Sequence, residues 1–378
     1  MKNILISGAS IAGPALAYWL AHRGFTVTVV EKAPALRSGG QAVDFRGDTH
    51  RTVLERTGIL QEVRRHQTDR TGQQIIDAHG RELAVIPPEF TGGDVEIQRG
   101  DLARILYDRS VAAGAHYVFG DSITSLTETA GGVHVTFESA APRTFDLVVG
   151  ADGIHSNVRR LAFGPESRYV THLGHYYALA DLPDRFAGPE QMYNEPGRML
   201  VSGGSKAGAL FVFAADELTY DRHSSADMKR VLLGAYRGMG WRGEEAAAAA
   251  ENVYLDSVSQ VRLDHYTRGR VVLVGDAAYG NTLGGFGTGL AIVAAYVLAG
   301  ELAESGGEHE RAFLAYEDAF RDYAKIARNG NAGRYLAPTT PRGIRMRNWI
   351  FKYRFLLKAM MKMGNQAATD ISLKNYAS

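Results

Sequence analysis

Three short apolar runs, each closed by a glycine, predict buried parallel strands. The runs cover residues 3–7, 147–149 and 270–274, and they end at Gly8, Gly150 and Gly275. Continuous apolar runs of this length are typical of strands that helices cover on both faces. The runs lie far apart in the sequence, so we expect distant parts of the chain to build one parallel sheet.

Helical patterns follow the first and last of these runs. Residues 14–23 predict a helix that starts with a proline and ends before Gly24. A β-branched strand at 25–30 follows, which completes a βαβ unit at the N-terminus. Residues 101–113 predict an amphipathic helix, and residues 289–302 a long apolar one.

Segments rich in short strands interrupt this pattern. Residues 70–97 resemble a hairpin, and residues 172–262 contain short strands with Gly and Pro turns. We therefore expect an α/β protein with a Rossmann-like domain on a parallel sheet (GR2 type), an inserted β-rich domain and a C-terminal helix. The expected boundaries are 1–69, 98–168 and 267–335 for the first domain, 70–97 and 169–266 for the second, and 336–378 for a helical segment across both.

The amino-acid composition excludes several classes of function. The 378 residues include 42 Lys and Arg against 41 Asp and Glu, so charge gives no reason to bind nucleic acid. The absence of cysteine excludes disulfides, thiol catalysis and iron–sulfur clusters. We find neither a signal peptide nor a membrane-spanning segment and expect a cytoplasmic protein. The basic, aromatic stretch 341–363 fits a helix packed on the protein better than a membrane-surface helix.

A phosphate-binding loop is indicated between the first strand and its helix. Residues Gly8 to Gly13 read Gly-Ala-Ser-Ile-Ala-Gly, which is the dinucleotide fingerprint with Ser10 at its second glycine. Such a loop directs the first N–H groups of the helix, around Ala12, toward a pyrophosphate. Glu31 lies at the end of the second strand, where a carboxylate binds a ribose hydroxyl and favours FAD or NAD over NADP. The alternative is a glycine-rich turn without a ligand.

Two further motifs join strands to helices: residues 146–159, with Asp-Gly at 152–153, and residues 275–289, with Gly-Asp at 275–276. Together with the first loop they resemble the class A flavoprotein monooxygenases, the single-component aromatic hydroxylases, and more narrowly the branch that inactivates tetracyclines and tailors polyketides. Residues 279–283 depart from the family pattern, which has His and Pro there.

The resemblance implies contacts to FAD. The implied cofactor-binding residues are Gly8, Ser10, Ala12, Gly13, Glu31, Lys32, Arg99, Asp276, Gly285, Gly287 and Thr288. Free N–H groups at 285–289 would stabilise negative charge on the reduced flavin. For Asp152 and Arg159 the alternative is a capped turn and a surface ion pair.

The resemblance also implies the reaction: NADPH or NADH reduces FAD transiently, O₂ reacts at flavin C4a, and one oxygen atom enters an aromatic or polycyclic substrate. The flavin carries this chemistry, so we expect no catalytic side chain and no metal. Substrate contacts are expected from Gln41, Tyr176, Tyr177 and Phe213, although the three aromatic residues equally fit ordinary core packing. The assembly is expected to be a monomer or homodimer. Alternatives are another flavoenzyme, such as an isoprenoid reductase or halogenase, and a non-catalytic protein that sequesters a ligand.

Overall fold

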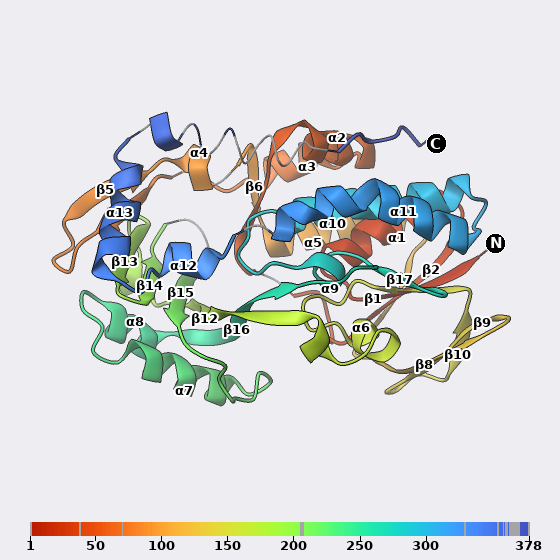
Figure 1. Cartoon of the computed structure of the whole chain (residues 1–378), viewed down its shortest axis with the longest axis horizontal. Helices are drawn as coiled ribbons and strands as arrows, with labels where there is room; N and C mark the ends of the chain where they lie inside the picture. The colour runs from red at the N-terminus through yellow and green to blue at the C-terminus, as the bar shows by residue number, and fades with distance from the viewer. Residues whose placement is uncertain are drawn as a thin grey trace.

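A computed structural model describes residues 2–37, 39–69, 71–91, 93–204, 208–328, 330–353, 355–357, 359, 362 and 371–376, apart from the side chains at 89 and 91. Within these residues the chain builds two large sheets, a smaller three-stranded sheet and a two-stranded ribbon. Figure 1 shows the helices around the two large sheets.

The first large sheet contains the three predicted buried runs. Its order is β17 (Thr267–Arg268), β18 (Val271–Leu273), β11 (Leu147–Gly150), β1 (Asn3–Ser7), β2 (Thr26–Glu31) and β7 (His116–Phe119). All neighbours are parallel except β17 and β18. The prediction of one parallel sheet from distant segments is confirmed.

The second large sheet is almost entirely antiparallel. Its order is β16 (Glu251–Val261), β12 (Val170–Asp181), β15 (Ala209–Ala214), β14 (Arg198–Ser202), β13 (Gln191–Glu195), β4 (Gln73–Ile76) and β5 (Glu82–Ile86). The predicted hairpin joins this sheet through the parallel pair β4 and β13. Its neighbour in sequence, β6 (Val95–Gln98), pairs instead with β3 (Ala42–Phe45).

The three-stranded sheet is a meander beside the parallel sheet. Its strands are β8 (Ile123–Thr129), β9 (Gly132–Phe137) and β10 (Arg143–Phe145).

Helices cover both large sheets. The helices are α1 (Ala12–His22), α2 (Gly47–Thr57), α3 (Leu60–Arg65), α4 (Pro88–Thr91), α5 (Arg99–Ala112), α6 (Asn157–Ala162), α7 (Ser225–Tyr236), α8 (Gly243–Ala249), α9 (Asp276–Tyr279), α10 (Gly287–Glu304), α11 (His309–Ala324), α12 (Ala332–Leu336) and α13 (Pro341–Phe351). Short 3-10 helices occupy 166–168, 184–186 and 325–328.

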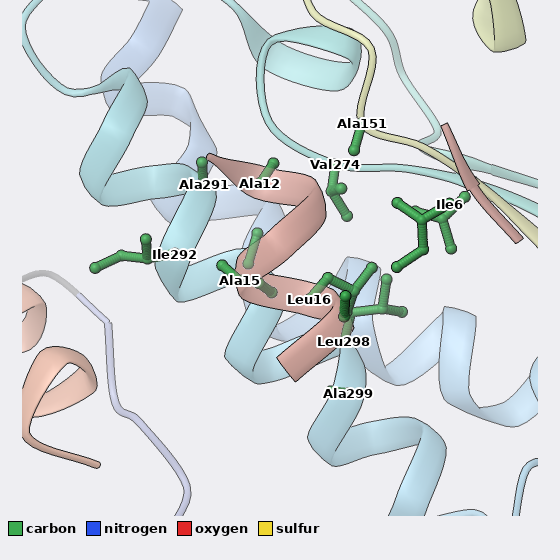
Figure 2. Close-up of a cluster of buried hydrophobic side chains, with 14 of the residues drawn as sticks. Ile6, Ala12, Ala15, Leu16, Ala151, Val274, Ala291, Ile292, Leu298 and Ala299 are labelled. Carbon is green, nitrogen blue, oxygen red and sulfur yellow. The ribbon is translucent and has the colours of Figure 1, made fainter. Parts of the chain in front are cut away.

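Small side chains let α1 and α10 pack closely above the parallel sheet. Ala12 and Ala15 of α1 and Ala291 of α10 lie in this contact, and Ile6 of β1 lies in the same core (Figure 2). Among the described helices, α10 alone is long and apolar enough to cross a membrane, but 78% of its apolar window is buried inside the protein. Its hydrophobicity is therefore that of a core helix.

The C-terminal region contacts both large sheets or their helices. Helix α13 packs on β5 and β13 of the second sheet. Residues 371–376 lie beside α10, where the Tyr376 hydroxyl donates to Glu301 over 2.9 Å. Several residues of the predicted helix beyond 353 lie outside the described residues.

Candidate FAD site

The loop between β1 and α1 requires glycine at two positions. Gly8 has φ +107°, and a Cβ there would lie 2.5 Å from the Ala151 carbonyl oxygen. A Cβ on Gly13 would lie 1.9 Å from the carbonyl oxygen of Gly8. No described side chain caps α1, and its first turn holds no acidic residue. The first N–H groups of α1, around Ala12, therefore remain available to an anion.

Glu31 ties this loop to the end of β2. Its carboxylate accepts hydrogen bonds from the Ala9 and Ala33 backbone N–H groups, each over 2.8 Å. Carboxylate oxygens have further lone pairs, so Glu31 retains acceptor capacity for a ribose hydroxyl. Lys32 follows it and is exposed.

Arg99 reaches from α5 to the same loop. Its guanidinium donates to the Ser10 hydroxyl over 2.9 Å. The Arg99 backbone N–H donates to the Gln41 carbonyl over 3.2 Å, which extends the β3–β6 ribbon by one bond. The structure thus brings Gln41, Arg99 and Ser10 together, and the hydroxyl at the second fingerprint position accepts a hydrogen bond where a glycine offers none.

Asp276 lies at the C-terminal end of β18, at the start of α9, and is open to solvent. Surrounding protein nevertheless desolvates the carboxylate and raises its pKa, and the charge of Arg99 opposes this shift. The preceding Gly275 has φ +64°, and a Cβ there would lie 3.0 Å from the Ala12 side chain. The two glycine turns therefore meet, with Asp276 on the same side of the site as Arg99.

The loop after α9 leads into the N-terminus of α10. Gly285 has φ +80° and faces open space, and a Cβ on Gly287 would lie 3.3 Å from an Asp276 carboxylate oxygen. Thr288 is in the first turn, which lacks acidic residues, and no described side chain caps the helix. A second helix with free N–H groups therefore starts beside Asp276.

The Asp-Gly motif has a structural role. Asp152 accepts hydrogen bonds from the Ser156 hydroxyl and from the Val158 N–H at 3.0 Å, and burial raises its pKa. Arg159 is fully buried and donates to the Ala277 carbonyl over 2.9 Å. The capped turn is as expected, and Arg159 forms an ion pair with Glu166 over 3.7 Å. The Arg159 end of that pair is not at the surface, because its buried side chain links α6 to α9 inside the protein.

The donor set fits a dinucleotide that ends in a flavin. The N-termini of α1 and α10 and the Arg99 guanidinium supply donors for a pyrophosphate and for a negatively charged ring edge. Asp276 supplies an acceptor for hydroxyl groups between them. Gly8 and Gly13 keep the backbone of the loop compact enough for a ligand to approach α1.

The predicted aromatic residues separate onto two faces of the second sheet, since side chains alternate along a strand. Tyr176 and Phe213 are buried in a cluster with residues of α7 and α8, on the side opposite α12 and α13 (Figure 1). Tyr177 lies on the other face, where the charge of Arg99 influences it. Tyr176 and Phe213 are therefore core residues. Tyr177 is also buried, and it is the one of the three that lies on the face where the charge of Arg99 acts.

A sequence comparison decides the family. The profile of the FAD binding domain family matches residues 1–327 of this chain. This chain belongs to that family.

Similar proteins and solved structures indicate which type of FAD-binding protein this chain is. An uncharacterized protein of Mycobacterium tuberculosis is 39% identical over 86% of this chain and 91% of its own length. A flavin-dependent monooxygenase of Legionella longbeachae is 35% identical over 85% of both chains. The crystal structure of the tetracycline destructase Tet(55) superposes with a TM-score of 0.83 at 32% identity, covering 100% of this chain and 99% of that one.

The chain is thus an FAD-dependent monooxygenase of the tetracycline destructase and aromatic hydroxylase type, a class A flavoprotein. The expected family and the expected α/β fold with an FAD-binding domain are confirmed.

Two residues that lie beside the predicted site residues were not among the predictions from the sequence. Tyr254 of β16 is 40% exposed, and its ring packs edge-on against Tyr177 at 5.9 Å. Strand alternation within residues 251–261 was the signal that places it on the Tyr177 face. His50 of α2 is buried against Gly289, where a Cβ would lie 2.1 Å from the ring. No local motif indicates this contact, which brings α2 against the start of α10.

Proposed function

We propose that this monooxygenase reduces FAD with NADPH or NADH and inserts one oxygen atom from O₂ into an aromatic or polycyclic, polyketide-like molecule. The observation that carries the proposal is the position of Arg99. It donates to Ser10 of the phosphate loop, and its charge acts on both Asp276 and Tyr177. Tyr177 and Tyr254, which together form the aromatic wall of this proposal, therefore lie on the Arg99 side of the antiparallel sheet.

The residues have distinct roles in this proposal. The α1 N-terminus and Arg99 hold the pyrophosphate, Glu31 binds the adenosine ribose, and Asp276 binds ribityl hydroxyls. The α10 N-terminus, with Gly285, Gly287 and Thr288, stabilises negative charge at the flavin ring. FAD, when bound, supplies the electron transfer and oxygen activation that side chains lack.

The substrate lies between the two large sheets in this proposal. Tyr254, which is 40% exposed and is backed by the buried ring of Tyr177, offers it aromatic surface and excludes water, which suits an apolar polycycle. We assign the parallel sheet to the FAD-binding domain (1–69, 98–168 and 267–335) and the antiparallel sheet to the substrate-binding domain (70–97 and 169–266). We assign residues 336–378 to a C-terminal segment across both domains, because α13 packs on β5 and β13 and Tyr376 donates to Glu301 of α10.

The test is turnover with FAD-loaded protein. We would follow oxidation of NADPH and NADH and consumption of O₂ with a panel of aromatic and polycyclic compounds. Tetracycline comes first, because two of the similar structures are tetracycline destructases. A product heavier by one oxygen atom, formed in step with NAD(P)H oxidation, supports the proposal.

Other products indicate the alternatives. A product that gains two hydrogens indicates a reductase, and a halogenated product in the presence of halide indicates a halogenase. Tight binding without NAD(P)H oxidation in every condition indicates a sequestering protein.

The variant Arg104→Ala serves as the control for loading of the protein with FAD. Arg104 lies on α5 beyond Arg99, and its guanidinium packs on the ring of Tyr107.

A further inference from the structure

A chain of polar groups joins the aromatic wall to the Asp-Gly loop. It runs from Tyr254 through Asp256 and His155 to Glu166, and the ring of Tyr177 packs edge-on against Tyr254 at 5.9 Å. We propose that Asp256, held by His155, fixes the direction of the Tyr254 hydroxyl, so that the wall accepts a hydrogen bond from a phenolic or enolic hydroxyl of the substrate. The substrate class rests on the proposed function, whereas the direction of the hydroxyl does not.

His155 bridges the two sheets. It lies between β11 and α6, and its Nε2 is 3.0 and 3.1 Å from the two carboxylate oxygens of Asp256 on β16. Its Nδ1 is 3.0 Å from a carboxylate oxygen of Glu166. Burial lowers the pKa of His155, but hydrogen bonds to the two carboxylates outweigh it and raise the pKa to about 9. Both ring nitrogens therefore donate.

Asp256 is the acceptor on which the Tyr254 hydroxyl depends. It is buried, yet His155 and nearby donors overcome desolvation and lower its pKa. An ionised carboxylate only accepts, so the Tyr254 hydroxyl, 2.9 Å away, must donate to it. With its proton committed to Asp256, the Tyr254 hydroxyl has only lone pairs to offer other groups.

Tyr254 is accessible to a ligand, so the direction of its hydroxyl affects which substrate groups it can bind. Tyr254 is 40% exposed, and the charge of Arg99 acts on Tyr254 as well as Tyr177. A phenol oxygen that gives its one hydrogen bond to a carboxylate still has lone pairs that accept. A ligand between Arg99 and the wall thus meets a hydroxyl oxygen that accepts and has no proton to give.

The experiment compares two probes that differ in one donor. FAD-loaded protein is titrated with 1-naphthol and with 1-methoxynaphthalene, and binding is measured by calorimetry and by the change in flavin absorption. The wild-type protein is expected to bind 1-naphthol about five- to tenfold more tightly than the ether, the size of one hydrogen bond. Tyr254→Phe should abolish that preference.

Asp256→Asn tests the direction of the Tyr254 hydroxyl directly, because it keeps the tyrosine itself. The Ser257 N–H donates to Asp256 Oδ1 over 2.7 Å, whereas Tyr254 contacts Oδ2. The amide oxygen of the variant would stay with Ser257 and His155, so its NH₂ group would donate to Tyr254. That reverses the Tyr254 hydroxyl and should reduce the preference to about onefold, without loss of the aromatic ring.

Tyr220→Phe is the matched control, because Tyr220 donates to the Leu255 carbonyl on the opposite face of the sheet. It should keep the wild-type preference. Equal binding of the two probes by the wild-type protein, binding of neither, or an unchanged preference in Tyr254→Phe overturns the inference. Should Asp256→Asn fail to fold, Tyr254→Phe decides. Absence of oxygenated products would overturn the proposed function but leave the probe preference intact.

Discussion

The Arg99 guanidinium donates to the Ser10 hydroxyl over 2.9 Å, which joins the start of α5 to the phosphate loop. Ser10 occupies the position where the fingerprint has its second glycine, so this bond compensates for the added side chain by orienting the arginine. It also fixes a cation between the loop and Asp276.

Replacement of Arg99 should therefore weaken cofactor binding. Arg99→Ala removes a charged donor, and we expect the Kd for FAD to rise about 10- to 100-fold. Fluorescence titration of apoprotein with FAD measures this change. Arg104→Ala, one turn or so further along α5, should bind like the wild type. An unchanged Kd in Arg99→Ala would show that Arg99 does not contribute to FAD binding.

A methyl group at Gly13 should disrupt the loop. Its Cβ would lie 1.9 Å from the Gly8 carbonyl oxygen, so the backbone must shift. We expect Gly13→Ala to lose about 1–3 kcal/mol of stability and most of its FAD affinity. Gly234→Ala is the control: Gly234 is exposed within α7, and its Cβ would contact nothing within 4 Å. That variant should gain about 0.5–1 kcal/mol. Urea unfolding and FAD titration measure both, and equal behaviour of the two variants would contradict the prediction.

Tyr279 stands where the family has His, and its hydroxyl accepts from the Gly275 N–H over 2.8 Å. Tyr279→Phe leaves that buried N–H without its acceptor, so we expect a loss of about 1–3 kcal/mol in the free energy of unfolding. Urea denaturation with and without FAD measures it. Tyr353→Phe, at a tyrosine that is 40% exposed, should change little. A fully stable Tyr279→Phe would show that the turn does not depend on this bond.

The His155 bridge should make stability depend on pH. Its pKa is about 9 in the folded protein, above the ordinary 6.5, because hydrogen bonds to Asp256 and Glu166 outweigh burial. A raised folded pKa stabilises fully below pH 6.5, and that contribution is lost as pH rises toward 9. His155→Gln should thus lower the Tm most at pH 6 and least above pH 9. Thermal scans across this range test it, with His172→Gln as the control, since His172 Nε2 lies 2.9 Å from the uncharged Ala215 carbonyl oxygen. A difference that is constant with pH would contradict the charged bridge.

Most of the fold and the predicted FAD-binding loops could be inferred from local sequence. The apolar runs predicted β1, β11 and β18 because a parallel strand covered on both faces must be apolar throughout. Gly8 and Gly13 were recognisable because their backbone leaves no space for a Cβ. The substrate side was less accessible: Tyr176 and Tyr177 are adjacent in sequence, and only the pairing of β12 decides which of them faces α7 and which faces Arg99.

The sequence by itself determined the family and the FAD cofactor, since both depend on short motifs in which neighbouring residues act together. Only the tertiary structure decided that Arg159 is buried, that His50 lies against Gly289, and that His155 meets Asp256 across 101 residues. Such contacts join segments that are far apart in the sequence. Their energies depend on burial and distance, which the order of residues along the chain does not encode locally.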